Sequence, residues 1–322
     1  MMRFRLQLCP MNAFNIMMLF SFSFYFNISA LANDPLTELS IKREQWLDVV
    51  LDSSMFPCAP YTPSKKLCHP DDNILPAGDM VLFNALLCQS GYQASCFAVL
   101  RSQEASGRWR RSPLHVNKPV HHEAGIFSKD HVLGLLIYFL TTEDRESATK
   151  WYSWLENVSP RTFPYAMKVC EKVHCVITPN LFSLMFRVWR ELGLRPSSQM
   201  SMHRYAANDR SLTLEAKRLS GYQLHLKAVA ALLLNLLDER PQHLINLLIK
   251  KQPDNPFYQY LAESPKEGVA ENMLDKCRVI TDESYRENSG HQWSWERDTE
   301  EEAWRYSMGW DCIFMANTLL GY

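Results

Sequence analysis

Arginine, tryptophan and histidine are concentrated in one long connection between apolar segments, residues 107–129. Arg108, Trp109 and Arg111 lie at its beginning, and His131 follows its end. A guanidinium can bind a carboxylate through two parallel hydrogen bonds, and an indole ring can stack on the flat face of a sugar ring. These residue types therefore suit an acidic saccharide. The structural alternative is a solvated loop whose Trp109 covers the edge of the core.

A second concentration of aromatic and acidic residues lies near the C-terminus. Trp293 and Trp295 alternate along the chain, so they share one face if the segment is extended. Glu296 and Asp311 are the nearby carboxylates. Hydrolysis of a glycosidic bond uses two carboxyl groups on opposite sides of the bond, one with a raised pKa so that it acts as the acid. The structural alternative is an aromatic lid that plugs the end of a helical array and is held by Cys312.

Two further acids, Asp79 and Asp130, stand where strongly apolar segments begin. An aspartate at a helix start accepts hydrogen bonds from unpaired N–H groups and meets the positive end of the helix dipole. Capping is the simple interpretation of both residues, and acid–base work is the functional one. The candidate catalytic residues are Asp79, Asp130, Glu296 and Asp311. The candidate substrate-binding residues are Arg108, Trp109, Arg111, His131, Trp293 and Trp295.

We expect no metal and no cofactor. His121 and His122 are adjacent and so point in different directions, and the chain has no His-Glu-x-x-His pair one turn apart. The chain also lacks the Gly-x-Ser-x-Gly, Gly-x-x-x-x-Gly-Lys and Gly-x-Gly-x-x-Gly patterns. An α/β-hydrolase, a P-loop enzyme and a Rossmann enzyme therefore have no support.

The candidate residues are connected by segments with a helical rhythm. Three similar apolar openings recur about fifty residues apart, beginning at Asp79, Asp130 and Asn180. Second helices are expected after these openings at 94–102, 145–157 and, more weakly, 197–208. Later helices are expected at 221–237, 241–250, 256–263, 267–277 and 299–320. A period near fifty residues predicts a stacked or closed array of helical hairpins.

The first helix of each hairpin is more apolar than the second. Residues 133–140 and 228–237 are apolar on nearly every face, which indicates burial on most sides and an inner position. Residues 145–157 are amphipathic and suit an outer layer. Strand alternation is rare, and the segments 168–177 and 291–295 are short strands or extended loops.

This pattern resembles the α/α-toroid, or six-hairpin, architecture of many glycoside hydrolases and polysaccharide lyases. The resemblance covers most of residues 75–320 and rests on helix rhythm, the contrast between inner and outer helices, and aromatic-rich connections. It implies an all-α fold, an α/α-toroid-like array of helical hairpins with long disulfide-clipped loops. No catalytic motif aligns residue by residue. The sequence does not show six complete helix pairs, so an incomplete toroid or an open helical array is the alternative.

The resemblance also implies where a ligand lies. In such proteins the inner helices start at one end of the array, here called the mouth, and the ligand crosses the loops there. Parallel inner helices bring the connections that enter them to the same end. We therefore expect the loop at Arg108–Arg111 to meet Trp293 and Trp295 at the mouth.

The first 32 residues have the pattern of a secretory signal peptide. Arg3 and Arg5 precede an apolar run at 14–28, and Ala30-Leu31-Ala32 is a cleavage pattern. An uncleaved anchor is the alternative. Residues 33–74 then form an N-terminal disulfide-clipped segment, and residues 75–322 form the helical-hairpin domain.

Eight cysteines remain after cleavage, and an even number in an exported chain favours disulfides over metal ligands. Short spacings favour pairing between neighbours. The favoured pairs are Cys58 with Cys68, Cys88 with Cys96, Cys170 with Cys175, and Cys277 with Cys312.

Charge and hydropathy limit the partners. Cleavage removes two of the 34 basic residues and none of the 35 acidic ones, so the net charge moves from -1 to -3. This balance does not suit nucleic acid, and no second apolar run of about 18 residues predicts a membrane span. The expected partner is a glycan or oligosaccharide, and the oligomeric state stays open.

Two classes of function follow. One is an exported glycan-acting protein, a glycoside hydrolase or polysaccharide lyase on an acidic saccharide. The other is a non-catalytic secreted helical scaffold that binds a protein or glycan partner. An enzyme needs at least two of the four acids within reach of one cleft, whereas a scaffold can distribute them as helix caps.

Overall fold

The structure is a computed structural model. It describes residues 34–51, 80–113, 116, 128–158, 167–168, 176–277, 293 and 309–322. Within these ranges the fold is all-α, as the sequence predicts. The exception is a pair of two-residue antiparallel strands, β1 (Met167–Lys168) and β2 (Val176–Ile177), in which Met167 lies opposite Ile177.

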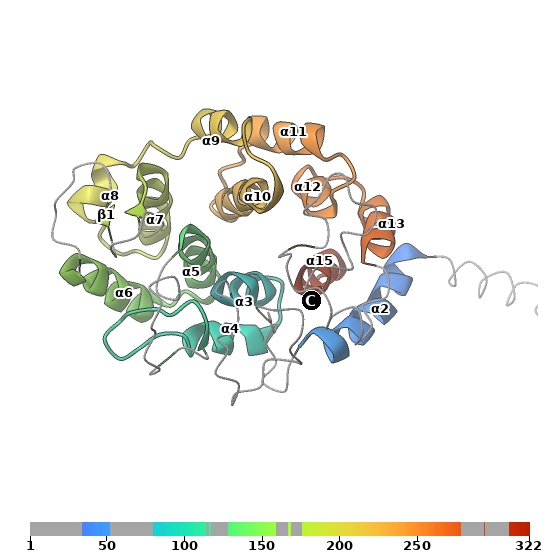
Figure 1. The fold of residues 1–322 in the computed structure, drawn as a ribbon, viewed down its shortest axis with the longest axis horizontal. Coiled ribbons are helices and arrows are strands. Elements are labelled where there is room, and N and C mark those ends of the chain that lie inside the picture. Colours follow the sequence, from blue (N-terminus) through green and yellow to red (C-terminus); the bar gives the residue numbers. More distant parts are fainter. Residues whose placement is uncertain are drawn as a thin grey trace, which may run out of the picture.

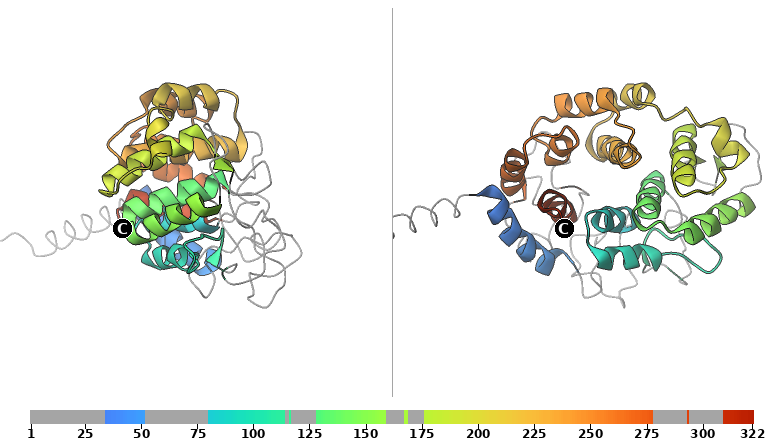
Figure 2. Two further views of the ribbon diagram at one scale, coloured as in Figure 1. Left: turned by 90° about the vertical axis from the view of Figure 1, so that its left-hand side faces the viewer. Right: turned by 180° about the vertical axis from the view of Figure 1, so that it is seen from behind.

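The helices form two layers, and Figure 1 shows one layer surrounding the other. The inner helices are α3 (Met80–Gln89), α5 (Lys129–Thr142), α7 (Pro179–Glu191), α10 (Gly221–Leu236), α12 (Pro256–Leu261) and α15 (Trp310–Leu320). The outer helices are α2 (Pro35–Val50), α4 (Gln93–Leu100), α6 (Arg145–Val158), α8 (Ser198–Met202), α9 (Asp209–Ala216), α11 (Gln242–Lys251) and α13 (Lys266–Lys276). The view from behind in Figure 2 shows the same two layers. The predicted helices in these ranges are present with shifted ends, except that the stretch 197–208 is helical only over Ser198–Met202. Helix α9 is not among the predicted elements.

Hydrophobic burial explains which helices lie inside. Every residue from Met80 to Cys88 in α3 is buried, and so is every residue from Asp130 to Phe139 in α5. The two helices touch through backbone at Gly134. A Cβ on this residue would lie 2.6 Å from the Cα of Leu82, closer than non-bonded carbon atoms approach. Glycine is therefore what allows this contact.

The starts of the inner helices correct one prediction. The caps of α5 and α7 are Ser128 and Thr178, whose hydroxyls accept from backbone N–H groups three residues later at 3.1 and 3.4 Å. Asp130 and Asn180 lie inside the first turn instead of before it. The earlier Ser or Thr has the extended backbone that a cap requires, so the helix begins one residue before the acid or amide. Asp79 lies outside the described residues.

The ends of the inner helices share a feature that the sequence pattern does not reveal. Each ends with a left-handed residue at or just after its last turn, and these residues are Gly91, Glu143, Gly193, Asp238, Glu263 and Gly321. At five ends the next N–H bonds back to the carbonyl five residues earlier, as in a Schellman motif. The donors are Tyr92, Leu194, Glu239, Ser264 and Tyr322. In the described residues, this ending marks six inner helices.

Helix α2 is not among the elements predicted from the sequence. Its start carries a clear signal, because Asp34 accepts from the N–H groups of Leu36 and Thr37 and Pro35 occupies the first turn. The helix packs against α13 and α15, so the beginning of the described chain meets its end. Arg43 donates from Nε to Asn317 in α15, and Asn317 in turn donates to Ser90 Oγ at 3.3 Å.

Two of the four favoured disulfides lie in the described residues, and both are present. Cys88–Cys96 joins α3 to α4, and Cys277–Cys312 joins the end of α13 to the start of α15. The other two favoured pairs and the predicted signal peptide lie outside the described residues. No helix among the described residues is long and apolar enough to cross a membrane.

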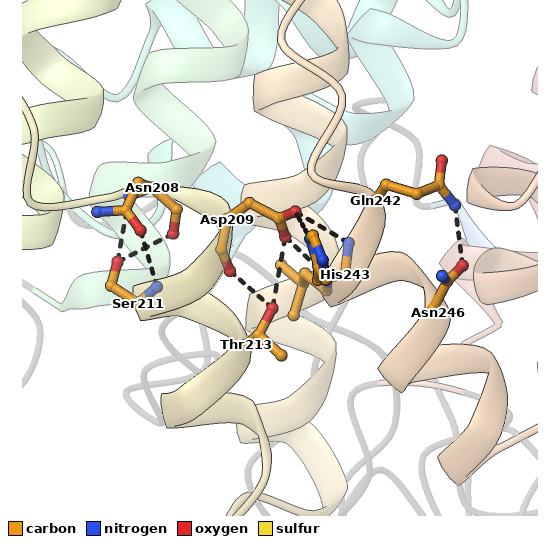
Figure 3. A network of polar contacts seen from close by, with 8 residues as sticks. Asn208, Asp209, Ser211, Thr213, Gln242, His243 and Asn246 are labelled. Atoms are coloured by element: carbon orange, nitrogen blue, oxygen red, sulfur yellow. Dashed lines mark hydrogen bonds and ion pairs between the residues drawn. The ribbon is translucent and has the colours of Figure 1, made fainter.

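A carboxylate joins two outer helices, as Figure 3 shows. Asp209, in the first turn of α9, accepts from the backbone N–H groups of His243 and Leu244, both at 2.9 Å, and its carboxylate lies 2.7 Å from the His243 ring Nδ1. It thereby caps α11 from a neighbouring helix. Burial raises the pKa of Asp209, but the hydrogen bonds to its carboxylate outweigh this effect and leave the pKa below its ordinary value.

Candidate functional site

The inner helices α5, α7 and α10 run in the same direction. Their last turns line one cavity, which Leu140, Leu192 and Leu236 contact from the three helices. The three helix starts therefore lie toward the other end of the array, the mouth.

A chain of contacts connects the starts of further inner helices. The carbonyl of Arg111 accepts from the N–H of Val81, in the first turn of α3, at 3.1 Å. Phe83 of α3 stacks on Trp310, the first residue of α15, with ring centroids 4.4 Å apart. Trp310 meets Trp293 edge to face at 4.7 Å. The arginine-rich loop and Trp293 thus approach the starts of two inner helices that pack against each other.

Trp293 extends this chain of contacts to α10 and α12. Its ring stacks on His225, near the start of α10, at 5.1 Å and on Phe257, in the first turn of α12, at 5.6 Å. With Trp310, these aromatic rings lie at the starts of three inner helices, and all are completely buried.

His225 is the most fully defined polar group at the mouth. Asn255 caps α12 through Oδ1, so its Nδ2 is the donor toward His225 Nε2 at 3.0 Å. The carbonyl of Gly221 can only accept, so the proton of the neutral ring lies on Nδ1, 3.0 Å from that carbonyl. Burial lowers the pKa of His225 to about 4, and the Gly221 hydrogen bond only partly offsets it. The ring is therefore neutral at physiological pH.

Asp130 and His131 lie in the first turn of α5, both buried. Burial and, to a smaller extent, the nearby Arg111 guanidinium lower the pKa of His131 to about 3. Asp311, in the first turn of α15, is also completely buried. Three of the predicted polar site residues thus belong to the first turns of inner helices.

Trp109 lies in the core, only 1% exposed, with its ring edge to face with Tyr138 and Phe139 of α5. Its loop packs closely on α6. Gly107 of the loop has φ +88°, and a Cβ on it would lie 2.4 Å from the carbonyl oxygen of Lys150 in α6. This position fits the alternative in which Trp109 covers the core. A sugar-stacking role for Trp109, and for the buried Trp293, stays a prediction.

Arg108 lies over α6, with its guanidinium 6.0 Å from the ring centroid of Trp154. Burial lowers its pKa, with a smaller lowering from Arg110, while Glu104 opposes both effects. The neighbouring Arg110 pairs with Glu104. Part of the arginine-rich loop is therefore occupied with local packing, and Arg111 is the member adjacent to the start of α3.

Three predicted site residues, Asp79, Trp295 and Glu296, lie outside the described residues. Two residues of the mouth are absent from the sequence prediction, His225 and Asn255. Asn255 precedes a proline, a combination typical of a helix start, so the sequence contained a signal for it. A single histidine within an apolar helix gives no comparable signal.

Comparison with known proteins finds no match to this chain among family models, curated proteins or solved structures. In the part of the chain that the structure describes, no group of three or more His, Cys, Asp or Glu side chains could hold a metal ion.

Proposed function

We propose that the two helical layers form an α/α-toroid-like array that binds and cleaves an acidic glycan at its mouth. The observation that supports this proposal is the position of buried polar groups in or near the first turns of three inner helices. Asp130, His131 and Asp311 belong to these turns, and His225 lies one turn further along α10. Unpaired N–H groups and the positive dipole ends at helix starts favour anionic groups, which supports an acidic saccharide.

The proposed roles follow from residue chemistry. Asp130 and Asp311 act as the acid and base pair, with Asp79 and Glu296 as further candidates. Arg111 and His131 contact the saccharide, with Arg108 and Trp295 as additional binding residues, while the buried Trp109 and Trp293 support the site from the core.

Assays on acidic and neutral oligosaccharides test this proposal. New reducing ends would identify a hydrolase, and unsaturated ends would identify a lyase. Asp130→Asn and Asp311→Asn should each reduce kcat by about 100-fold or more, because general acid–base catalysis contributes at least that factor. The matched control is Asp254→Asn, an exposed surface acid. Full activity in both folded variants would exclude these roles.

A second candidate is a scaffold that binds a glycan or protein without turnover. The complete burial of Trp293, Trp310 and Phe257 favours it, because these rings fill space that a cleft would otherwise occupy. In this case oligosaccharide binding persists without products, and neither Asp→Asn variant changes the affinity.

We also propose that residues 1–32 are removed and that the chain is exported. The two disulfides support an oxidising compartment. Mass spectrometry of the exported protein should give the mass of residues 33–322, and a full-length mass in a membrane fraction would contradict this.

A further inference from the structure

A cavity of about 290 Å³ opens at the end of the array opposite the mouth. Leu140, Leu192 and Leu236 supply its apolar lining from α5, α7 and α10. The side chain of Leu236 is 38% exposed, so apolar surface is available there. This volume is at the lower limit for small-ligand sites and suits a short aliphatic group.

Three charged residues line the same cavity: Glu143, Arg145 and Glu191. All three are exposed, and among the described residues no ion pair joins any of them to an opposite charge. The Arg145 guanidinium lies beside Gly193, 3.9 Å from where a Cβ would stand. Two carboxylates and one guanidinium leave the side-chain charge of the lining at one negative unit.

The backbone adds to this negative potential. The cavity lies where α5, α7 and α10 end, and each helix end carries roughly half a negative charge from its last carbonyl groups, against one positive helix start, that of α6 at Arg145. Glu143 is the left-handed residue that ends α5, with φ 53°, and it lines the cavity.

We propose that this cavity binds an alkylammonium group, with the aliphatic chain on the three leucines and the ammonium facing Glu143, Glu191 and the helix ends. The group comes either from a free aliphatic amine or from a lysine side chain of a protein partner. The site is separate from the mouth and does not depend on the proposed glycan function.

Titration calorimetry of the exported form tests the proposal with n-pentylammonium as probe. A ligand of six heavy atoms should bind with a Kd of about 1 mM. The uncharged n-pentanol and the anionic pentanoate should bind at least about tenfold more weakly, because only the ammonium meets the negative potential. Equal affinity for the amine and the alcohol would overturn the proposal.

Charge variants give a signed test. Glu143→Gln and Glu191→Gln should each weaken n-pentylammonium binding by about threefold, and Arg145→Gln should strengthen it by a similar factor. Glu143→Gln keeps the same backbone demand, and Glu156→Gln, at the other end of α6, is the matched control without effect. Unchanged affinity in both cavity Glu→Gln variants would reject the site.

A lysine peptide distinguishes the two sources. If acetyl-Gly-Lys-Gly-amide binds more tightly than n-pentylammonium, the group belongs to a protein partner. If the free amine binds more tightly, the ligand is a small amine. Both results support the alkylammonium chemistry. If neither ligand binds, the proposal is wrong.

Discussion

His225 has every polar atom of its ring engaged without exposure to water. Nδ1 donates to the Gly221 carbonyl, and Nε2 accepts from Asn255. The second proton of the Asn255 amide is directed to Gln252 at 2.6 Å. Protonation of His225 would place an N–H against the Asn255 amide donor and a charge in the core, so the fold favours the neutral ring.

Acid should therefore destabilise the protein through His225. Its pKa is about 4 in the fold, against the ordinary 6.5. The stabilisation is complete above the unfolded pKa and is lost as the pH falls from 6.5 toward 4. The loss reaches about 2.5 kcal/mol by pH 4.5. Urea unfolding across this range measures it. His225→Gln should be less stable at neutral pH but should show a shallower loss in acid.

His131 adds a loss that also begins below pH 6.5 and continues to about pH 3, its pKa in the fold. The slope in His225→Gln is therefore reduced but not abolished. An identical pH dependence in wild type and His225→Gln would contradict the role assigned to the buried ring.

At the scale of elements, the inner helices depend on close backbone approach and on their ends. The left-handed residue after each inner helix turns the chain back toward the outer layer, and glycine occupies this position in three of the six described cases. Glu143, Asp238 and Glu263 occupy it elsewhere, which is why a search for glycine after apolar runs does not find six units.

Gly134, at the contact between α3 and α5, should tolerate no larger residue without a loss of stability. Gly134→Ala places a methyl group 2.6 Å from the Leu82 Cα and should cost about 1–3 kcal/mol by forcing the helices apart. Gly268→Ala, in α13, meets nothing within 4 Å and should stabilise by about 0.5–1 kcal/mol through helix propensity. Chemical denaturation measures both, and equal effects would show that helix contact does not control the difference.

At the scale of the whole molecule, the two ends of the described chain meet. Helix α15 packs against α2 and α3, and the buried Arg43, Asn317 and Ser90 join these parts through hydrogen bonds. Tyr322 adds a further contact, since the Arg43 guanidinium lies 4.1 Å from the centroid of its ring. Stability at this junction therefore depends on residues far apart in sequence.

The two described disulfides should differ in their contribution to stability. Cys277–Cys312 spans 35 residues and Cys88–Cys96 spans 8. Loop-closure entropy gives about 4 kcal/mol for the longer loop and about 2.5 kcal/mol for the shorter one. Double Cys→Ser variants of each pair, compared by unfolding under non-reducing conditions, should show this order. A larger loss from the shorter loop would indicate that packing outweighs chain entropy here.

The sequence by itself determined the helical class, most helix positions and two disulfide pairings, because helical periodicity and short cysteine spacings are local properties. It did not identify α2, whose apolar face is sparse and whose burial depends on α13 and α15. Tertiary structure alone decided which aromatic rings are buried. Trp109 and Trp293 look like binding residues by type, yet packing from other helices covers both. Exposure depends on neighbours distant in sequence, so residue type and spacing do not specify it.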